Sequence, residues 1–177
     1  MSKIINLFGG PGIGKSAIAA GIFYNLKKQH ISCNNPYEFP KSLAWDSNTP
    51  AIKDQLYVFA NQHRGIAQSY GKVDYIIVDS PILFSKIYSN YYTKGYPSSF
   101  YGETFNTFVL ELHNRYDNLN ILLERVEGVH NEEERFQNYG ESLTIDKFCK
   151  VVLEQDKIPY YTVKVGEKTV ENILKLL

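Results

Sequence analysis

Residues 9–16 read Gly-Gly-Pro-Gly-Ile-Gly-Lys-Ser and have the G-x-x-x-x-G-K-S spacing of a phosphate-binding loop. An apolar run at 3–8 precedes this segment and a helical apolar repeat follows it, which is the context in which the motif binds phosphate. Glycines let successive backbone N–H groups face phosphate oxygens, and the following helix N-terminus adds positive charge. A glycine-rich turn without a ligand is the alternative. The motif predicts nucleoside triphosphate binding by Gly10, Pro11, Gly12, Ile13, Gly14, Lys15, Ser16 and Ala17.

The end of this loop and a second apolar run supply the predicted metal ligands. Lys15 is expected to contact the β- and γ-phosphates of ATP, and Ser16 to bind Mg²⁺. Asp79 ends the apolar run at 75–78, and ligands collect at the carboxyl ends of strands in open parallel sheets. We therefore predict that Asp79 helps to hold Mg²⁺. An aspartate that only caps the next turn is the alternative.

Two arginines are predicted to act on the transferring phosphoryl group. Arg125 lies near the end of the apolar run 119–126, and Arg135 lies in the polar segment 127–141, which we interpret as a lid. Arginines in these places neutralise charge that develops in the transition state of phosphoryl transfer. The alternative for Arg135 is a solvated pairing with the glutamates at 132–134.

The segment after the second predicted strand carries a candidate general base. Glu38 lies between Pro36 and Pro40, which restrict the local backbone. A carboxylate within hydrogen-bonding reach of an acceptor hydroxyl orients it and accepts its proton. Lys41 is a candidate contact for an acceptor phosphate. A surface glutamate and a solvated lysine are the alternatives.

A helical face further along the chain suits a nucleobase. Gln55, Phe59 and Gln62 are spaced by four and then three residues, so they share one face. Amides can pair with a base edge while a ring packs on its face, although for Phe59 a core position is favoured. Arg64 is a further candidate contact for a phosphate.

Six aromatic rings fall within residues 88–103, together with two glycines and a proline. This spacing predicts an ordered loop or insertion. Tyr91, Tyr92, Tyr96 and Tyr101 are candidates for stacking on an unstacked base, each stack contributing on the order of 1–3 kcal/mol. Lys94 alone supplies positive charge in this segment. Self-packing of the loop or a subunit interface in a homodimer is the alternative.

These residues must be positioned by alternating strands and helices. Apolar runs at 3–8, 73–79, 119–126 and 160–165 predict strands buried in a parallel sheet. Helical repeats lie between them, at 18–26, 52–66, 105–116 and 145–152, and a further one closes the chain at 170–177. The pattern predicts one α/β domain over residues 1–177, a three-layer P-loop kinase fold with a parallel sheet flanked by helices and an arginine-bearing lid.

Bulk composition narrows the classes of function. Nineteen basic residues balance nineteen acidic ones, so nucleic-acid contact would need a local patch. Cys33 and Cys149 lie far apart and are predicted to be reduced. No apolar run approaches a membrane span, and a cytoplasmic protein, in the host cytoplasm if viral, is expected. The chain has no room for the second domain of a ring-forming motor and no N-K-x-D motif of a GTPase.

The segments INLFGGPGIGKS, DQLYVFANQHR, VDYIIVDSPIL, YDNLNILLERV and IPYYTV occur in this order. With them the chain resembles small bacteriophage P-loop kinases of the thymidylate kinase-like group, in particular the hydroxymethyl-deoxyuridine DNA kinases. The resemblance runs from residue 3 to about residue 165. It implies phosphorylation of the hydroxymethyl group of hydroxymethyluracil in phage DNA, a step of thymine hypermodification. Relatives carry a Gly-Arg-x-Gln lid element, whereas this chain has Glu134, Arg135, Phe136 and Gln137.

Together these features predict a kinase that uses ATP and Mg²⁺ and phosphorylates a hydroxyl of a nucleobase or nucleotide acceptor. Hydroxymethyluracil in DNA is the favoured acceptor. Free deoxynucleosides or deoxynucleoside monophosphates are the alternative acceptors. A nucleotide hydrolase and a nucleotide-binding module without an acceptor are the alternatives from other classes.

Overall fold

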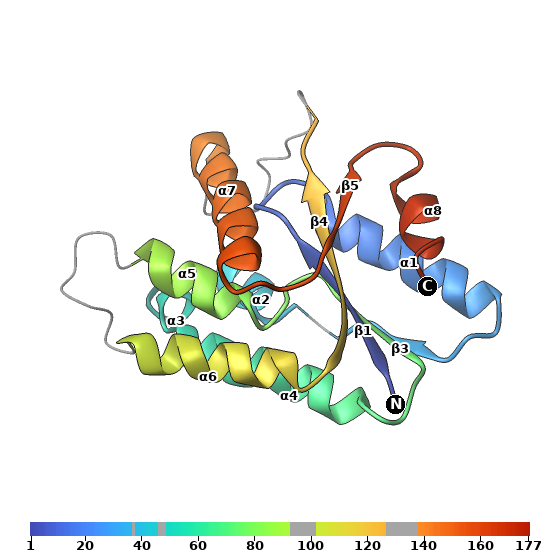
Figure 1. Cartoon of the computed structure of the whole chain (residues 1–177), viewed down its shortest axis with the longest axis horizontal. Helices are drawn as coiled ribbons and strands as arrows, with labels where there is room; N and C mark the ends of the chain where they lie inside the picture. Colours follow the sequence, from blue (N-terminus) through green and yellow to red (C-terminus); the bar gives the residue numbers. More distant parts are fainter. Residues whose placement is uncertain (37, 46–48, 93–101, 127–137) are drawn as a thin grey trace.

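The structure is a computed structural model, and it describes residues 1–36, 38–45, 49–92, 102–126 and 138–177. Five strands form a single sheet in the order β2-β3-β1-β4-β5, with every neighbouring pair parallel (Figure 1). Their bounds are β1 Lys3–Phe8, β2 Cys33–Asn34, β3 Tyr75–Val78, β4 Asp117–Glu124 and β5 Tyr161–Lys164. The predicted parallel sheet is therefore confirmed.

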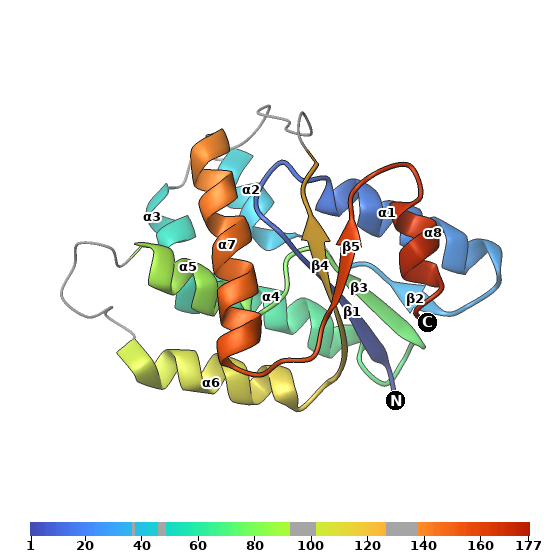
Figure 2. The ribbon, with the colours of Figure 1, turned by 45° about the horizontal axis from the view of Figure 1, so that its top comes forward.

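Helices cover both faces of this sheet, as the apolar strands require. One face packs against α1 (Lys15–Lys28) and α8 (Thr169–Leu174). The other face packs against a larger group of helices (Figures 1 and 2), namely α4 (Gln55–Ser69), α5 (Phe84–Tyr92), α6 (Gly102–Asn114) and α7 (Tyr139–Gln155). Alternation along β1 divides its side chains between the layers, because Ile4 and Phe8 enter one core cluster while Ile5 and Leu7 enter the other.

The helix predicted through 52–66 is two helices, α3 (Thr49–Lys53) and α4. Asp54 lies between them, and its carboxylate accepts a hydrogen bond from the backbone N–H of Tyr57 at 3.0 Å. An aspartate in this position caps a new helix N-terminus, so the continuous apolar stripe was wrong. Leu56, which was part of that stripe, is 46 % exposed.

Both ends of the predicted aromatic loop are helical. Residues 88–92 belong to α5, residues 102 and 103 open α6, and residues 93–101, with Lys94, Tyr96 and Tyr101, lie outside the described residues. Residues four apart lie on one side of a helix, so their rings can pack there. The centroids of Phe84 and Tyr88 lie 5.9 Å apart, and those of Tyr88 and Tyr92 lie 5.8 Å apart.

Of the predicted lid, 127–141, the structure describes the last four residues. Residues 127–137 lie outside the described residues, and Arg135 is among them. Asn138 caps α7: its side chain accepts from the Glu141 N–H at 3.0 Å, while the Glu141 carboxylate accepts from the Asn138 N–H at 2.9 Å. Because this capping box starts a helix, residues 139–141 belong to α7.

The cysteines and the helix lengths bear on two further expectations. Cys33 and Cys149 are buried free thiols, and burial raises the pKa of Cys149 to about 12. Within the ranges that the structure describes, no helix is long and apolar enough to cross a membrane.

Candidate active site

The phosphate loop joins β1 to α1 and depends on glycine at its tightest points. Gly12 and Gly14 have φ angles of 73° and 94°, a left-handed region that other residues rarely adopt, and Gly14 directly precedes α1. The Lys15 ammonium group donates to the carbonyl oxygens of Gly9 at 2.8 Å and Gly10 at 3.1 Å. Lys15 is the first residue of α1, and its side chain extends back to the start of the phosphate loop.

Two side chains from distant parts of the chain brace the other side of the loop. The Asp146 carboxylate, on α7, accepts from the Gly10 N–H at 2.5 Å and from the Arg125 Nε at 2.8 Å. Arg125 also donates to the Pro11 carbonyl at 2.9 Å. Sequence reasoning missed Asp146, because its partner Gly10 lies 136 positions away in the sequence.

Glu38 lies beside the end of the phosphate loop. The Ser16 hydroxyl donates to the Glu38 Oε2 at 3.4 Å. The segment that carries Glu38 rests on α4, because the ring of Phe39 contacts Tyr57 edge to face, with centroids 5.2 Å apart. Residue 38 follows β2 and precedes α2 (Phe39–Trp45), so it lies at the carboxyl edge of the sheet.

Asp79 follows β3 and is 6 % exposed. The next residue, Ser80, accepts a hydrogen bond from the Gln62 amide at 2.5 Å. The carboxyl end of β3 is thereby linked to the glutamine face of α4.

The predicted glutamines are both buried, and each has an amide oxygen without a hydrogen-bond partner among the described residues. The Gln55 amide nitrogen donates to the Ile52 carbonyl at 2.6 Å. Phe59 is a core residue whose ring contacts Phe105 edge to face, at 5.8 Å between centroids. Arg64 is exposed and lies on another side of α4, away from the glutamines.

Tyr91 is held against α7 by its ring and its hydroxyl. The hydroxyl donates to Glu141 at 3.1 Å, and the ring contacts Phe148 at 6.4 Å between centroids. Burial and, after it, the Glu141 carboxylate raise the pKa of Tyr91. Tyr92 stacks on Tyr88. Lys41 lies in α2, and its side chain lies outside the described part of the structure.

The oxygen donors near the phosphate loop are of the kind that Mg²⁺ prefers. Mg²⁺ is usually held by one or two carboxylates, water and substrate phosphates, and not by a full set of protein ligands. Ser16 and Asp79 would hold the ion here, with Glu38 beside Ser16. No cluster of three or more potential metal-binding His, Cys, Asp or Glu side chains occurs in the described ranges.

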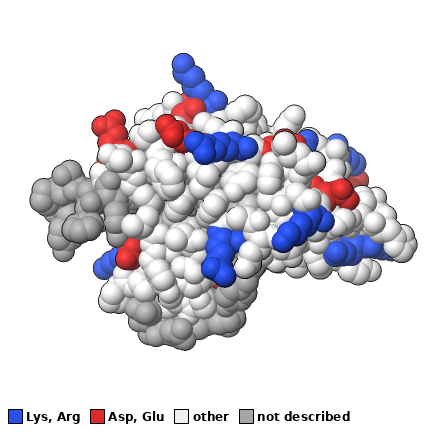
Figure 3. Space-filling model, turned by 90° about the horizontal axis from the view of Figure 1, so that it is seen from below, with Lys and Arg blue, Asp and Glu red and all other residues white. Residues whose placement is uncertain are grey.

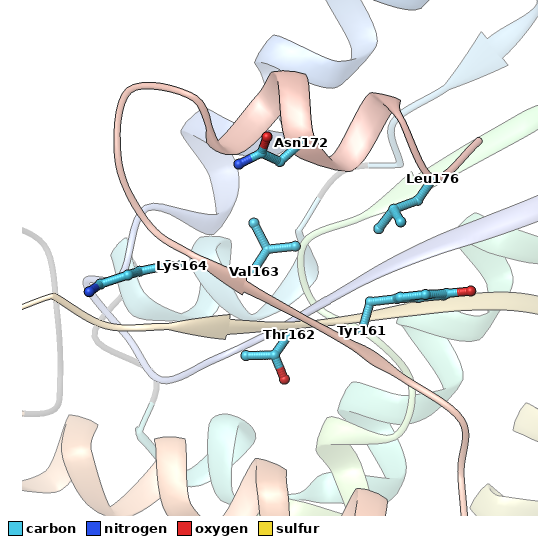
Figure 4. A pocket seen from close by; sticks show the side chains of 6 residues that line it. All are labelled: Tyr161, Thr162, Val163, Lys164, Asn172 and Leu176. Carbon is cyan, nitrogen blue, oxygen red and sulfur yellow. The ribbon is translucent and has the colours of Figure 1, made fainter.

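A separate hollow lies between β5 and α8 (Figure 4) and contains none of the predicted site residues. It is lined by Tyr161, Thr162, Val163, Lys164, Asn172 and Leu176.

Comparison with known proteins agrees with the fold and the phosphate loop. A family model described as "AAA domain" matches residues 4–171, so the chain belongs to this family. The whole chain also has the fold of solved kinase structures. No curated protein matches the sequence.

Three such structures are of deoxyadenosine kinase from M. mycoides. The form with the products dCMP and a flexible dCDP is 18% identical, with a TM-score of 0.63. The form with dATP is 19% identical (TM-score 0.60), and the form with dCTP is 17% identical (TM-score 0.57). Each alignment covers 98% of this chain and 97% of the other. At these identities the likeness shows a shared fold, a P-loop kinase fold.

Proposed function

We propose that this protein is a kinase that transfers the γ-phosphoryl group of Mg-ATP to a hydroxyl of a free deoxynucleoside. The observation that carries the proposal is the contact between Glu38 and Ser16, whose oxygen atoms lie 3.4 Å apart. A carboxylate there stands beside the predicted metal ligand, where a base for an acceptor hydroxyl is needed. A nucleotide-binding module has no requirement for such a base.

Each residue has a proposed role in the reaction. Lys15 and the loop N–H groups bind the phosphates, and Ser16 and Asp79 would hold Mg²⁺. Bound Mg²⁺ would supply positive charge that neutralises the phosphates of ATP. Glu38 accepts the proton of the acceptor hydroxyl. The hydroxyl oxygen bonds to the γ-phosphorus, and the bond between the γ-phosphorus and the bridging β-phosphate oxygen breaks, which releases ADP.

Gln55 and Gln62 support a nucleobase as part of the acceptor. A buried amide oxygen without a hydrogen bond costs about 1–3 kcal/mol, which a ligand N–H donor would relieve. Both glutamines have such an oxygen, and nucleobases carry amino and imino donors on their edges. The structural neighbours, deoxyadenosine kinases with bound deoxynucleotides, support a deoxynucleoside as the acceptor.

Hydroxymethyluracil in DNA is the second candidate acceptor, supported by the sequence resemblance to bacteriophage DNA kinases. Two observations make it the weaker candidate. The net charge of the chain is zero, and on the face in Figure 3 the blue Lys and Arg side chains lie separately on a mainly white surface. Tyr91, a predicted stacking residue, is engaged with Glu141 and Phe148.

Incubation with γ-labelled ATP and Mg²⁺ tests these proposals. The acceptors are deoxynucleosides, deoxynucleoside monophosphates and hydroxymethyluracil-containing DNA, each in a separate reaction. We expect label on a deoxynucleoside. Label only on a monophosphate or only on DNA would overturn the acceptor proposal but keep the kinase. Release of labelled phosphate without any acceptor would indicate a hydrolase, and ATP binding without turnover a binding module.

A further inference from the structure

Asp146 connects α7 to the phosphate loop through a set of contacts that we call the Asp146 clasp. The clasp consists of Asp146, Arg125, Gly10 and Pro11. One carboxylate oxygen of Asp146 accepts from the Gly10 N–H and the other accepts from Arg125, whose guanidinium group also donates to the Pro11 carbonyl. A single carboxylate thus joins α7, the end of β4 and the start of the loop.

The clasp is closely packed. The Arg125 and Asp146 side chains are 6 % and 19 % exposed. A Cβ atom on Gly10 would collide with the backbone oxygen of Ser142, on the turn of α7 before Asp146. Because the backbone of α7 touches the loop here, only glycine leaves room for this contact.

Both backbone polar groups of Gly10 are hydrogen-bonded. Its N–H donates to Asp146, and its carbonyl accepts from Lys15. Pro11 has no N–H, so the N–H groups from Gly12 onward remain to bind phosphate. The clasp therefore sets the start of the loop and, through Gly10, the place of the Lys15 ammonium group.

We propose that Asp146 and Arg125 are positioning residues that hold the phosphate loop in its nucleotide-binding shape before ATP arrives. The proposal rests on the nucleotide-binding part of the proposed function and is independent of the acceptor. It adds to the role predicted for Arg125 an action on the loop, through Asp146 and Pro11. Preorganisation of this kind raises affinity because the loop does not have to be ordered on binding.

α7 offers a matched control. Asp156 caps its C-terminus about 15 Å further along the helix axis, and its carboxylate pairs with Lys86 of α5 at 2.6 Å. The side chains of this pair are 15 % and 14 % exposed, which resembles the burial of the clasp. Asp146→Asn and Asp156→Asn each remove one paired carboxylate from the same helix, and only the first touches the loop.

The test is calorimetric titration of the full chain with ATP in the presence of Mg²⁺, for wild type, Asp146→Asn and Asp156→Asn. We expect Asp146→Asn to raise the Kd for ATP about tenfold, because it weakens a charge-assisted network. Asp156→Asn is expected to change that Kd by less than about twofold, since distant sites act independently. Thermal melts establish that each variant is folded at the titration temperature.

The outcomes are distinct. Equal ATP affinity in wild type and Asp146→Asn, or equal weakening in both variants, would overturn the clasp as a positioning device. Absence of ATP binding by wild type would instead overturn the proposed function. A second pair, Arg125→Ala and Asp146→Ala, should weaken ATP binding less in combination than the sum of the single effects, because both act through one network. Additive effects would separate Arg125 from Asp146 and contradict the inference.

Discussion

The Lys15 ammonium group is held by two carbonyl groups of the phosphate loop. These contacts hold the ammonium group near the loop N–H groups that are predicted to bind phosphate. Its side chain is half-buried, lies over the ring of Phe84 at 5.4 Å from the centroid, and belongs to neither core cluster. Removal of the side chain should therefore affect the ligand more than the fold.

Lys15→Ala is expected to lower phosphoryl transfer by about 10²-fold or more, since an electrostatic contact to the transferring group is lost. The thermal stabilisation that Mg-ATP confers should shrink with it, because less binding energy is linked to the native state. A thermal-shift titration with ATP measures this. Lys27→Ala, an exposed substitution on the same helix, is the control. Undiminished ATP stabilisation and normal turnover in Lys15→Ala would contradict the loop assignment.

The Glu38→Gln variant tests whether Glu38 is a general base or a surface residue without a catalytic role. A base acts on the acceptor, so kcat should fall about 10²–10⁴-fold. The Kd for ATP should change by less than about threefold, because the amide still faces Ser16. Steady-state kinetics at saturating acceptor provide the comparison, with exposed Glu103→Gln on α6 as the control. A kcat loss below about threefold would return Glu38 to a structural role.

At the scale of elements, α5 and α7 are tied at both ends, by Lys86 with Asp156 and by Tyr91 with Glu141. This pairing connects the predicted acceptor side to the helix that carries the Asp146 clasp. In the structure Tyr91 packs against α7. The sequence suggested a ring that stacks on a base.

Tyr91→Phe tests that difference. The hydroxyl bond to Glu141 is lost while the ring remains against Phe148, so the free energy of unfolding should fall by about 1 kcal/mol. Urea unfolding measures the change, and acceptor KM should stay within about twofold of wild type. An unchanged stability with a raised acceptor KM would place the hydroxyl in the acceptor site.

Local signals account for what the sequence predicted well. The apolar runs gave the four longer strands, and the glycine spacing of residues 9–14 identified the turn between β1 and α1. The cap at Asp54 and the four-residue spacing of the rings in α5 are also local signals. The apolar stripe at 52–66 and the glycines and proline of 88–103 predicted other structures for these segments. The role of Asp146 was out of reach because its contact with Gly10 spans 136 positions and depends on how α7 packs.

At the scale of the whole molecule, His113 makes stability depend on pH. Its side chain is 2 % exposed, its Nε2 has no partner among the described residues, and burial lowers its pKa to about 4. The folded state keeps the imidazole neutral, whereas the unfolded chain binds a proton near its ordinary pKa of 6.5. Acid therefore favours the unfolded state as the pH falls from 6.5 towards 4.

Between pH 7 and pH 5 this group should remove about 2 kcal/mol from the free energy of unfolding. Urea unfolding at the two pH values measures the loss. His113→Gln keeps a polar side chain that does not titrate, so its stability should fall by less over the same range. Equal pH dependence in wild type and variant would show that other groups cause the effect.

The proposed function requires that this protein turns over ATP only by transfer of the γ-phosphoryl group to an acceptor hydroxyl. The most direct measurement follows ADP and phosphorylated deoxynucleoside together in one reaction with Mg-ATP. We expect that both form in equal amounts, that omission of the deoxynucleoside stops ADP formation, and that Glu38→Gln lowers both equally. ADP and free phosphate formed at the same rate with and without deoxynucleoside would contradict it.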